Sequence, residues 1–304
     1  MPLIKAIQKK LFTRLIWYWE RQRPYPLLNK IWEQSPLESD LNSSWKLVLL
    51  STEETIVEAM WSAYSIITSI RSRPEIVFYI DGRIDEEEKR KISKLFPHAK
   101  IKLSHEIIDQ IPEQYLFLKK AAQTNSSARK LAIPAIESED RAVLYSDSDI
   151  LFFKRPVELE ESIRTGNGVW HVNAYEGIRG DVRLLNVFRE TNTPFLDQYN
   201  SGLFFLSKGK LQLDQIEPWL NPKNCDPNAW FIDQTVLAAL LKALDSKLLP
   251  MEEYVVSCNR QFYFQKDHDY SKIVMRHFMG PVRHLMYLKG IPVVLKNLGK
   301  NHVL

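Results

Sequence analysis

The sequence predicts an α/β fold with a single mixed sheet flanked by helices. From residue 46 onward, short apolar runs of strand length alternate with segments of helical spacing. The run EIVFYI is continuously apolar, as expected for a parallel strand covered on both faces. The chain is long enough for one large domain, with 304 residues of which 45% are hydrophobic. Its two cysteines, Cys225 and Cys258, lack zinc-ligand spacing and are too few for a disulfide framework.

The elements follow one another as a strand–helix series. KLVLL predicts the first strand, and Ser51 with Glu54 predicts a capping box for the helix that follows. EIVFYI predicts the second strand, and DEEEKRKISKLF a surface helix with acids first and bases later. AKIKL, a helix from about Ser127 to Ile136, and RAVLYS complete the series. Right-handed crossovers would place these strands in one sheet.

Residues 1–44 predict a separate segment that precedes a domain at residues 45–304. Seven bases and one acid lie in residues 1–30, which leaves 34 bases and 36 acids in the rest. Apolar positions near helical spacing predict a basic amphipathic helix, which either docks on the domain or binds an anionic membrane surface. The polar stretch from Glu33 to Ser44 predicts a linker. The nearly neutral remainder argues against nucleic-acid binding.

Targeting signals are weak in this sequence. No apolar run reaches the roughly 18 residues that a membrane-spanning helix needs, and the amino terminus lacks the cleavage site of a secretory signal. The sequence therefore predicts a cytoplasmic protein, peripheral to the cytoplasmic membrane face if residues 1–30 bind lipid.

Two aspartates, Asp147 and Asp149, directly follow the strand RAVLYS. Residues i and i+2 of an extended chain point to one side, so both carboxylates are expected at the carboxyl edge of the sheet, where open α/β sheets bind ligands. Two carboxylates this close repel one another unless a cation or proton intervenes, and Mg²⁺ or Mn²⁺ takes such oxygen ligands. A pair of solvated turn acids is the alternative interpretation.

Five segments between about residues 46 and 290 carry a more specific signal. They are VFYIDGRIDEEEKRKISKLFP, ARKLAIPAIESEDRAVLYSDSDILFFKRPVEL, YNSGLFFL, WFIDQTVLAALL and RHFMGPVR. In this order they resemble the Rossmann-like (GT-A) glycosyltransferases with a DxD motif, and within them the retaining enzymes of family 8. The resemblance implies a nucleotide-diphospho-sugar transferase fold. It also implies metal-dependent transfer of a sugar from a nucleotide-sugar donor, with UDP as the inferred nucleotide, to a carbohydrate or glycan acceptor.

The resemblance further implies roles for single residues. Metal ligands would be Asp147, Asp149 and His277, a set of carboxylates and imidazole that suits Mn²⁺ better than an all-oxygen set would. The residues that would contact the donor are Lys130, Asp147, Asn200, Gly202, Gly280 and Arg283. Arg283 stands where the family usually has a diphosphate-binding lysine, and arginine can hold phosphate through paired hydrogen bonds. A core histidine and a solvated lysine are the alternative interpretations of His277 and Lys130.

Asp233 and Gln234 would be the catalytic pair at the reaction centre. They interrupt an otherwise apolar run, and Asp226 with Pro227 already supplies a helix cap and first turn, so Asp233 is not needed for capping. A buried carboxylate needs a partner. We expect a hydroxyl of the transferred sugar to be that partner, and a nearby lysine is the alternative.

Two other functions remain open at this point. A haloacid dehalogenase-like phosphatase also has an apolar strand followed by DxD, but its motif lies on the first strand and continues with Gly and Thr. A non-catalytic nucleotide-sugar binding protein would use overlapping residues. A nucleotidyltransferase would need a glycine-rich loop after the first strand, where STEETIVEAM has no glycine. Acceptor choice is expected to lie around Trp170–Asn186 and Tyr254–Tyr270.

Overall fold

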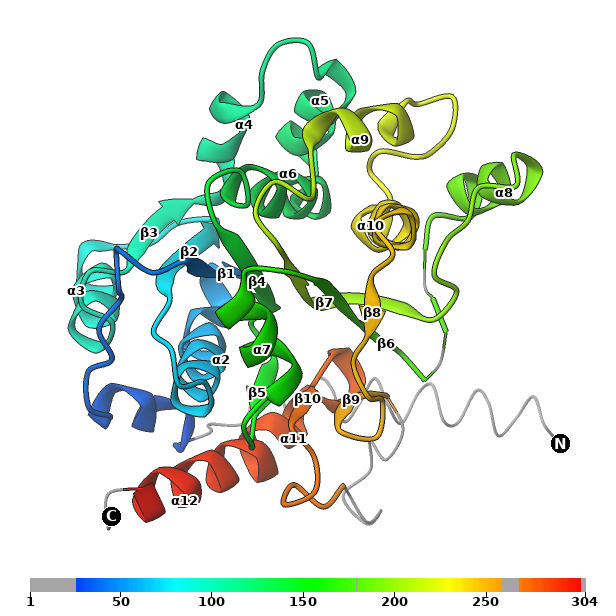
Figure 1. Ribbon diagram of the computed structural model, residues 1–304. Coiled ribbons are helices and arrows are strands. Elements are labelled where there is room, and N and C mark those ends of the chain that lie inside the picture. Colours follow the sequence, from blue (N-terminus) through cyan, green and yellow to red (C-terminus); the bar gives the residue numbers. More distant parts are fainter. Residues whose placement is uncertain (1–25, 176, 179, 259–267, 302–304) are drawn as a thin grey trace, which may run out of the picture.

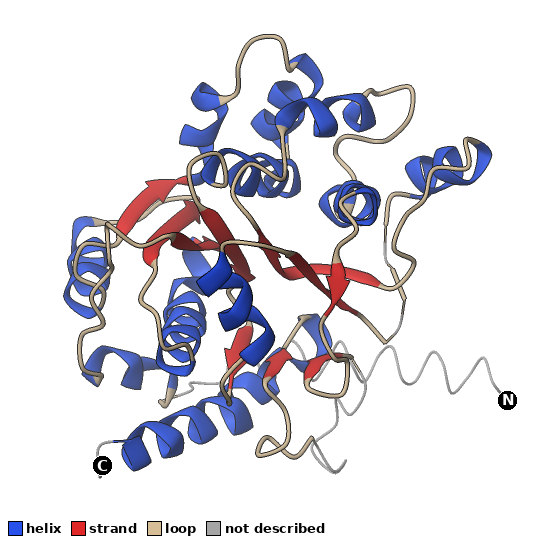
Figure 2. Cartoon of the chain, in the orientation of Figure 1, coloured by secondary structure: helices blue, strands red, loops and turns tan. Residues whose placement is uncertain are grey.

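The computed structural model of the protein describes residues 26–301 apart from residues 176, 179 and 259–267. Its centre is a seven-stranded mixed sheet with the strand order β3-β2-β1-β4-β7-β6-β8, and helices lie on both faces (Figures 1 and 2). The predicted α/β fold class is therefore confirmed.

The parallel half of this sheet contains the four strands predicted from apolar runs. They are β1 (Trp45–Thr52), β2 (Glu75–Asp81), β3 (Lys100–Leu103) and β4 (Ala142–Asp147). The other half contains β7 (Tyr199–Leu206), β6 (Val169–Asn173) and β8 (Lys247–Leu248). Strand β7 runs antiparallel to both β4 and β6, so the chain direction reverses next to the strand that carries Asp147.

Helices cover the two faces of the sheet in separate groups (Figure 1). One face carries α4 (Ile107–Gln110), α5 (Leu116–Thr124), α6 (Ser126–Glu137), α8 (Val182–Glu190), α9 (Leu213–Ile216) and α10 (Ile232–Ala243). The other carries α2 (Ile56–Ser69), α3 (Glu86–Leu95), α7 (Val157–Thr165) and α12 (Ile291–Asn301). Short helical turns are η1 (Leu28–Glu33), η2 (Glu53–Thr55), η3 (Ser104–Glu106), η4 (Glu217–Leu220), η5 (Gly280–Val282), α11 (Arg283–Leu285) and η6 (Met286–Gly290).

The sheet separates two apolar cores because alternate strand residues point to opposite faces. Val48, Val77 and Val143 pack on the side of α6 and α10. Leu47 and Leu49 pack on the side of α2 and α12. Both faces of the central strands are thus buried, which explains their continuously apolar sequences.

A second, three-stranded sheet was not predicted. In it, β5 (Ile150–Phe152) pairs antiparallel with β10 (Met275–His277), which pairs parallel with β9 (Tyr254–Val256). Only the turn at Ser148 and Asp149 separates β5 from β4. Strands β9 and β10 lie more than a hundred residues after β5 in the chain, so no local pattern could reveal this sheet.

Two helix starts were predicted wrongly. Strand β1 continues through Ser51 to Thr52, and the capping box forms between Thr52 and Thr55, one residue later than expected. The helix expected to start at Asp226 begins only at Ile232. The Asp226 carboxylate instead accepts a hydrogen bond from the backbone N–H of Asn228 (3.0 Å) and so stabilises a turn.

The stretch interpreted as a linker packs on the domain, whereas residues 1–25 of the predicted amphipathic helix lie outside the described residues. Ile31 in η1 is fully buried. The indole N–H of Trp61 donates to the Leu28 carbonyl (2.8 Å), and the Tyr64 hydroxyl donates to the Ser35 carbonyl (3.1 Å). Leu28 and Ser35 thus lie against helix α2.

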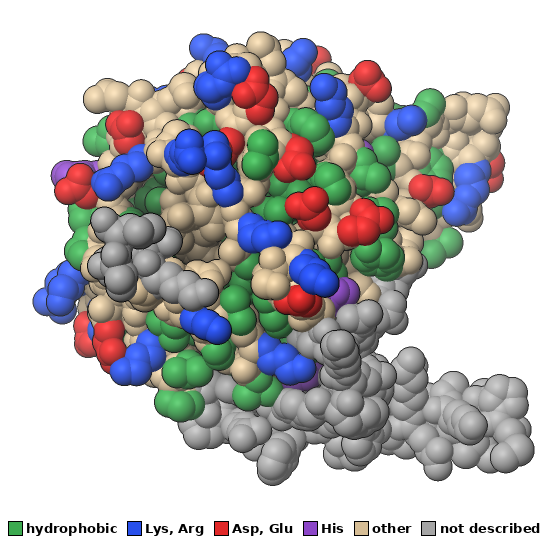
Figure 3. All heavy atoms as spheres, turned by 60° about the horizontal axis from the view of Figure 1, so that its bottom comes forward, with side chains coloured by type: hydrophobic (Ala, Val, Ile, Leu, Met, Phe, Trp, Pro, Cys, Tyr) green, Lys and Arg blue, Asp and Glu red, His purple; other side chains and the backbone are tan. Residues whose placement is uncertain are grey.

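Across the described part of the chain, every helix is too short or too polar to span a bilayer. On the face shown in Figure 3, Lys and Arg side chains are interspersed with Asp and Glu. This mixture fits the nearly balanced charge of residues 31–304.

Candidate active site

The turn between β4 and β5 places the two aspartates. Asp147 ends β4, and Asp149 lies in the turn and is buried. The spacing argument from the sequence assumed an extended chain at this point, whereas the structure has a turn. The two carboxylates still converge, and β10 brings His277 to them because His277 pairs with Ile150. Ligand atoms of the three residues all lie within 4.8 Å of one another.

His277 is oriented by a hydrogen bond on each ring nitrogen. Its Nδ1 lies 2.9 Å from Oδ1 of Asn200, an oxygen that also accepts the backbone N–H of Gly202 (3.0 Å). Nδ1 must therefore carry a hydrogen, and Nε2, which lies 2.9 Å from Asp149 Oδ1, is the ring nitrogen on the side of the aspartates. A metal-binding histidine needs this tautomer, fixed by a hydrogen bond on its other nitrogen. Two carboxylates and this imidazole fit Mn²⁺ or Mg²⁺, although no ion is shown.

Gly202 provides the room that His277 needs. A Cβ atom at residue 202 would lie 2.4 Å from Cε1 and 2.6 Å from Nδ1 of the His277 ring. Asn200 and Gly202, predicted to border a donor sugar, thus both contact His277. Gly280 lies apart from them, where its φ of +36° begins the turn that leads to Arg283.

A basic side chain contacts each aspartate. Lys130 Nζ donates to both oxygens of Asp147 (2.8 and 3.0 Å), and Arg283 Nη2 donates to Asp149 Oδ2 (2.5 Å). Burial alone would raise the pKa of Asp149, but the charges and hydrogen bonds of Arg283 and His277 hold this pKa well below its usual range. Burial likewise opposes the charge of Lys130, yet Asp147 and Asp233 keep the pKa of Lys130 above its ordinary value.

Asp233 is buried in the first turn of α10 and has a lysine within reach. Lys130 Nζ lies 3.5 Å from its Oδ2, and the Ser201 hydroxyl donates to the same oxygen (2.8 Å). Burial raises the pKa of Asp233, and Lys130 and Ser201 offset part of the increase. The alternative partner considered from the sequence, a lysine, is therefore present. Gln234 beside it is buried as well.

Two residues of this cluster were missed from the sequence. Tyr145 donates its hydroxyl to Asp147 Oδ1 (3.0 Å), and Ser201 connects Lys130 with Asp233. Tyr145 could have been found, because residues 145 and 147 point to the same face of a strand. Ser201 could not, since nothing local distinguishes it within the apolar strand β7.

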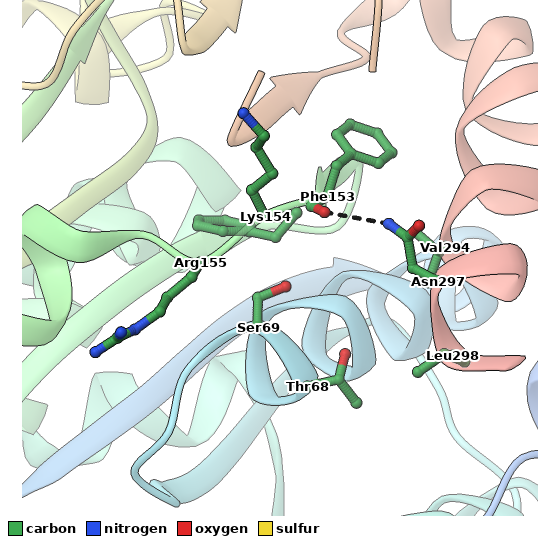
Figure 4. Close-up of a pocket in the computed structure, with 9 residues that line it drawn as sticks. Thr68, Ser69, Phe153, Lys154, Arg155, Val294, Asn297 and Leu298 are labelled. Carbon is green, nitrogen blue, oxygen red and sulfur yellow. Dashed lines mark hydrogen bonds between the residues drawn. The ribbon is translucent and has the colours of Figure 1, made fainter. Parts of the chain in front are cut away.

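A separate pocket lies away from these residues, between the end of α2, the chain after β5, and α12 (Figure 4). Its volume is about 330 Å³, and Asn297 on its wall donates to the carbonyl of Phe153 (3.1 Å). None of the residues predicted for the site lines it.

None of the protein-family models or curated proteins compared with the chain matches it. Solved structures do. The galactosyltransferase LgtC, solved with donor and acceptor sugar analogues, has a TM-score of 0.53 at 12% identity, over 83% of this chain and 95% of its own. The bifunctional glycosyltransferase WbbM has a TM-score of 0.52 at 15% identity, over 86% of this chain and 52% of its own.

A third match is the glycosyltransferase GlyE of Streptococcus pneumoniae TIGR4, with a TM-score of 0.50 at 17% identity, over 86% of this chain and 64% of its own. The chain thus spans about half of WbbM and just under two thirds of GlyE. At these identities the similarity concerns the fold, and it confirms the predicted glycosyltransferase (GT-A) fold.

Proposed function

We propose that this protein is a glycosyltransferase that transfers a sugar from a nucleotide-sugar donor to a carbohydrate or glycan acceptor. The donor is proposed to be a UDP-sugar, and Asp147, Asp149 and His277 are proposed to bind Mn²⁺ or Mg²⁺. The observation that carries the proposal is the convergence of these three side chains at the carboxyl edge of β4, with Lys130 and Arg283 beside them. That edge is where open α/β sheets bind ligands.

The charges of this cluster suit departure of a nucleoside diphosphate. Breaking the bond between sugar and phosphate leaves extra negative charge on the diphosphate, and a bound divalent cation stabilises that charge as it develops. Arg283 adds a second cation, whose side chain is 34% exposed. At an effective dielectric near 20, two unit charges about 4 Å apart interact by roughly 4 kcal/mol.

We further propose that the transfer retains the anomeric configuration of the donor. This rests on the resemblance of Asp233 and Gln234 to the reaction centre of family 8. Both side chains are buried at the start of α10, and Asp233 contacts Lys130 and Ser201. Gln234→Ala should lower turnover more than donor affinity. Proton NMR of the product reports the configuration, and an inverted product would reject retention alone.

The fold argues against the phosphatase considered from the sequence. Asp147 follows the fourth strand in chain order, beside the antiparallel β7, and not the first strand. Lys130 also binds both oxygens of Asp147, the residue that would have to act as the nucleophile.

One experiment separates transfer from binding. A panel of nucleotide sugars is incubated with the protein and Mn²⁺, and release of nucleoside diphosphate is followed for wild type and Asp149→Asn. We expect release with one donor, abolished by excess chelator and strongly reduced in the variant. Donor binding without any release would identify a non-catalytic binding protein.

Residues 1–30 are proposed to contact an anionic membrane surface. The support is their seven bases against one acid, flanking apolar positions near helical spacing.

A further inference from the structure

Arg283 contacts a proposed metal ligand in this structure. Its Nη2 donates to Asp149 Oδ2, while His277 Nε2 lies against Oδ1 of the same carboxylate. Both oxygens of Asp149 are therefore engaged by nitrogen atoms of the chain. A divalent cation held between Asp147, Asp149 and His277 would lie close to the guanidinium on Oδ2 of Asp149, and two cations this close repel one another.

The guanidinium is only partly used in this contact. A guanidinium has five N–H donors, yet Nε of Arg283 is buried without a hydrogen-bond partner among the described residues. The bond to Asp149 is made through Nη2 alone and lacks the paired geometry of the strongest arginine–carboxylate contacts. Arg283 thus retains a buried, unsatisfied donor beside the proposed diphosphate site, as expected for a side chain that has a second partner.

A second acid, Glu58, interacts electrostatically with Arg283. Glu58 of α2 is buried and accepts the hydroxyl of Tyr287 (2.7 Å), which lies four residues after Arg283. Burial raises the pKa of Glu58, and Tyr287 and the charge of Arg283 counteract that increase. Glu58 thus adds a second negative group on the side of Tyr287, four residues after Arg283.

We propose that Arg283 and the divalent cation exchange at Asp149, and that this exchange couples metal binding to binding of an anionic diphosphate. Without metal, Arg283 neutralises Asp149. With metal bound, Asp149 and His277 hold the cation, and the released guanidinium donates paired hydrogen bonds to diphosphate oxygens. The inference rests on the proposed function, since it assumes a metal at Asp147, Asp149 and His277.

The exchange makes a distinctive prediction, because Arg283 should oppose Mn²⁺ binding and favour UDP binding. Arg283→Ala should bind Mn²⁺ about tenfold more tightly in the absence of nucleotide, since the competing cation is gone. The same variant should bind UDP about tenfold more weakly at saturating Mn²⁺, since a charge-assisted phosphate contact is lost. A purely structural role for Arg283 would weaken both.

The test uses the full chain and a matched control. Mn²⁺ binding is measured by electron paramagnetic resonance of unbound Mn²⁺, and UDP binding by calorimetry, for wild type, Arg283→Ala and Arg283→Gln. Arg283→Gln keeps most of the side chain's length without its charge and guards against a packing defect. The control is Arg164→Ala, which removes an exposed arginine that donates to Glu161 on α7. Thermal unfolding checks that each variant is folded.

We expect Mn²⁺ affinity to rise in both Arg283 variants and to stay unchanged in Arg164→Ala. Unchanged or weaker Mn²⁺ binding in both folded Arg283 variants would overturn the exchange but leave the proposed function intact, provided that wild type binds Mn²⁺ and releases nucleotide. A wild-type protein that binds no Mn²⁺ would instead reject the metal site, and the exchange with it.

Discussion

Two buried polar clusters lie at opposite ends of helix α6, and they differ in how their charges are balanced. At the amino-terminal part of the helix, Lys130 contacts Asp147 and Asp233. Seven residues later, roughly 10 Å along the helix, Glu137 accepts hydrogen bonds from Lys46 (2.7 Å), Lys102 (2.6 Å) and the Tyr79 hydroxyl (2.6 Å).

The Glu137 cluster is balanced by the chain itself. Lys46 also contacts Asp140, which lies 3.5 Å from Arg141 as well, so each acid of this cluster has a cation of the chain beside it. The Lys130 cluster has three acids, Asp147, Asp149 and Asp233, against the two cations Lys130 and Arg283. Counting these carboxylates and basic side chains alone, it carries one surplus negative charge. A balanced buried cluster needs no further partner, whereas a surplus of acid beside an imidazole calls for a cation from outside.

The largest expected effect follows from removing a charge on the unbalanced side. Asp149→Asn keeps the shape but takes away a ligand charge, so transfer should slow by at least about 10²-fold, a loss of roughly 3 kcal/mol. The measurement is initial transfer rate against Mn²⁺ concentration after chelator treatment. A variant as fast as wild type, or full wild-type activity in excess chelator, would mean that Asp149 does not bind a metal that the transfer needs.

Removing the charge on the balanced side should affect stability instead of turnover. Glu137→Gln leaves Lys46 and Lys102 without their shared carboxylate, and breaking such a buried pair costs about 3 kcal/mol of unfolding free energy. Urea unfolding measures the loss, and transfer rate per folded molecule should stay close to wild type. Equal unfolding free energies of variant and wild type would show that the Glu137 ion pairs contribute little to the stability of the fold.

The same acid predicts a pH dependence of stability. Burial alone would raise the pKa of Glu137, but hydrogen bonds from Lys102, Lys46 and Tyr79 lower it from 4.5 to about 2. Because the folded-state pKa is depressed, the stabilisation is complete above pH 4.5 and is lost as the pH falls toward 2. The shift corresponds to about 3 kcal/mol. Unfolding free energies measured between pH 7 and 3 should fall less steeply in Glu137→Gln.

Local patterns in the sequence predicted the parallel half of the fold well. All four predicted strands of that half form, and so do the helices around Ser127–Ile136 and after Asp85. The reason is that both faces of β1, β2 and β4 are buried, so these strands are mostly apolar, whereas the edge strand β3 alternates lysines with apolar residues. Asp149 and His277 were singled out with the help of a family resemblance, and the structure brings them together.

The sequence failed where contacts are made between distant segments. The pairing of β5 with β10 joins residues 150–152 to residues 275–277, and it is this pairing that delivers His277. The contact of Arg283 with Asp149 and the role of Ser201 depend on it or on similar long-range packing. The start of α10 was misplaced because Asp226 can stabilise either a helix end or a turn, and a local pattern does not choose between them.

A smaller effect should follow from disturbing the residues that orient His277. Gly202→Ala places a Cβ atom 2.4 Å from Cε1 of His277, so the ring has to move. Asn200→Ala removes the acceptor that fixes its tautomer. Each change should weaken Mn²⁺ binding by about tenfold, a typical loss for a residue that orients a metal ligand. Gly209→Ala is the control, since it changes another glycine with open space around its Cβ position. Its own φ of +65° adds local strain far from His277, so it should leave Mn²⁺ affinity unchanged.

The smallest expected effect concerns residues 1–30, where seven bases face one acid. The excess of bases in this segment suits a negatively charged partner outside the chain. An anionic lipid surface attracts each nearby base by about 1 kcal/mol. Single changes to Gln should therefore each weaken binding to anionic vesicles about fivefold, as measured by co-sedimentation, at Lys5, Lys9 or Lys10. The matched control changes Lys89, Lys91 and Lys94 of α3, a helix whose bases lie among acids. A chain that begins at Pro26 keeps η1 and its buried Ile31 and should not sediment. Binding that survives this truncation, or falls equally in the α3 variants, would place any lipid contact on the domain and leave residues 1–30 without a membrane role.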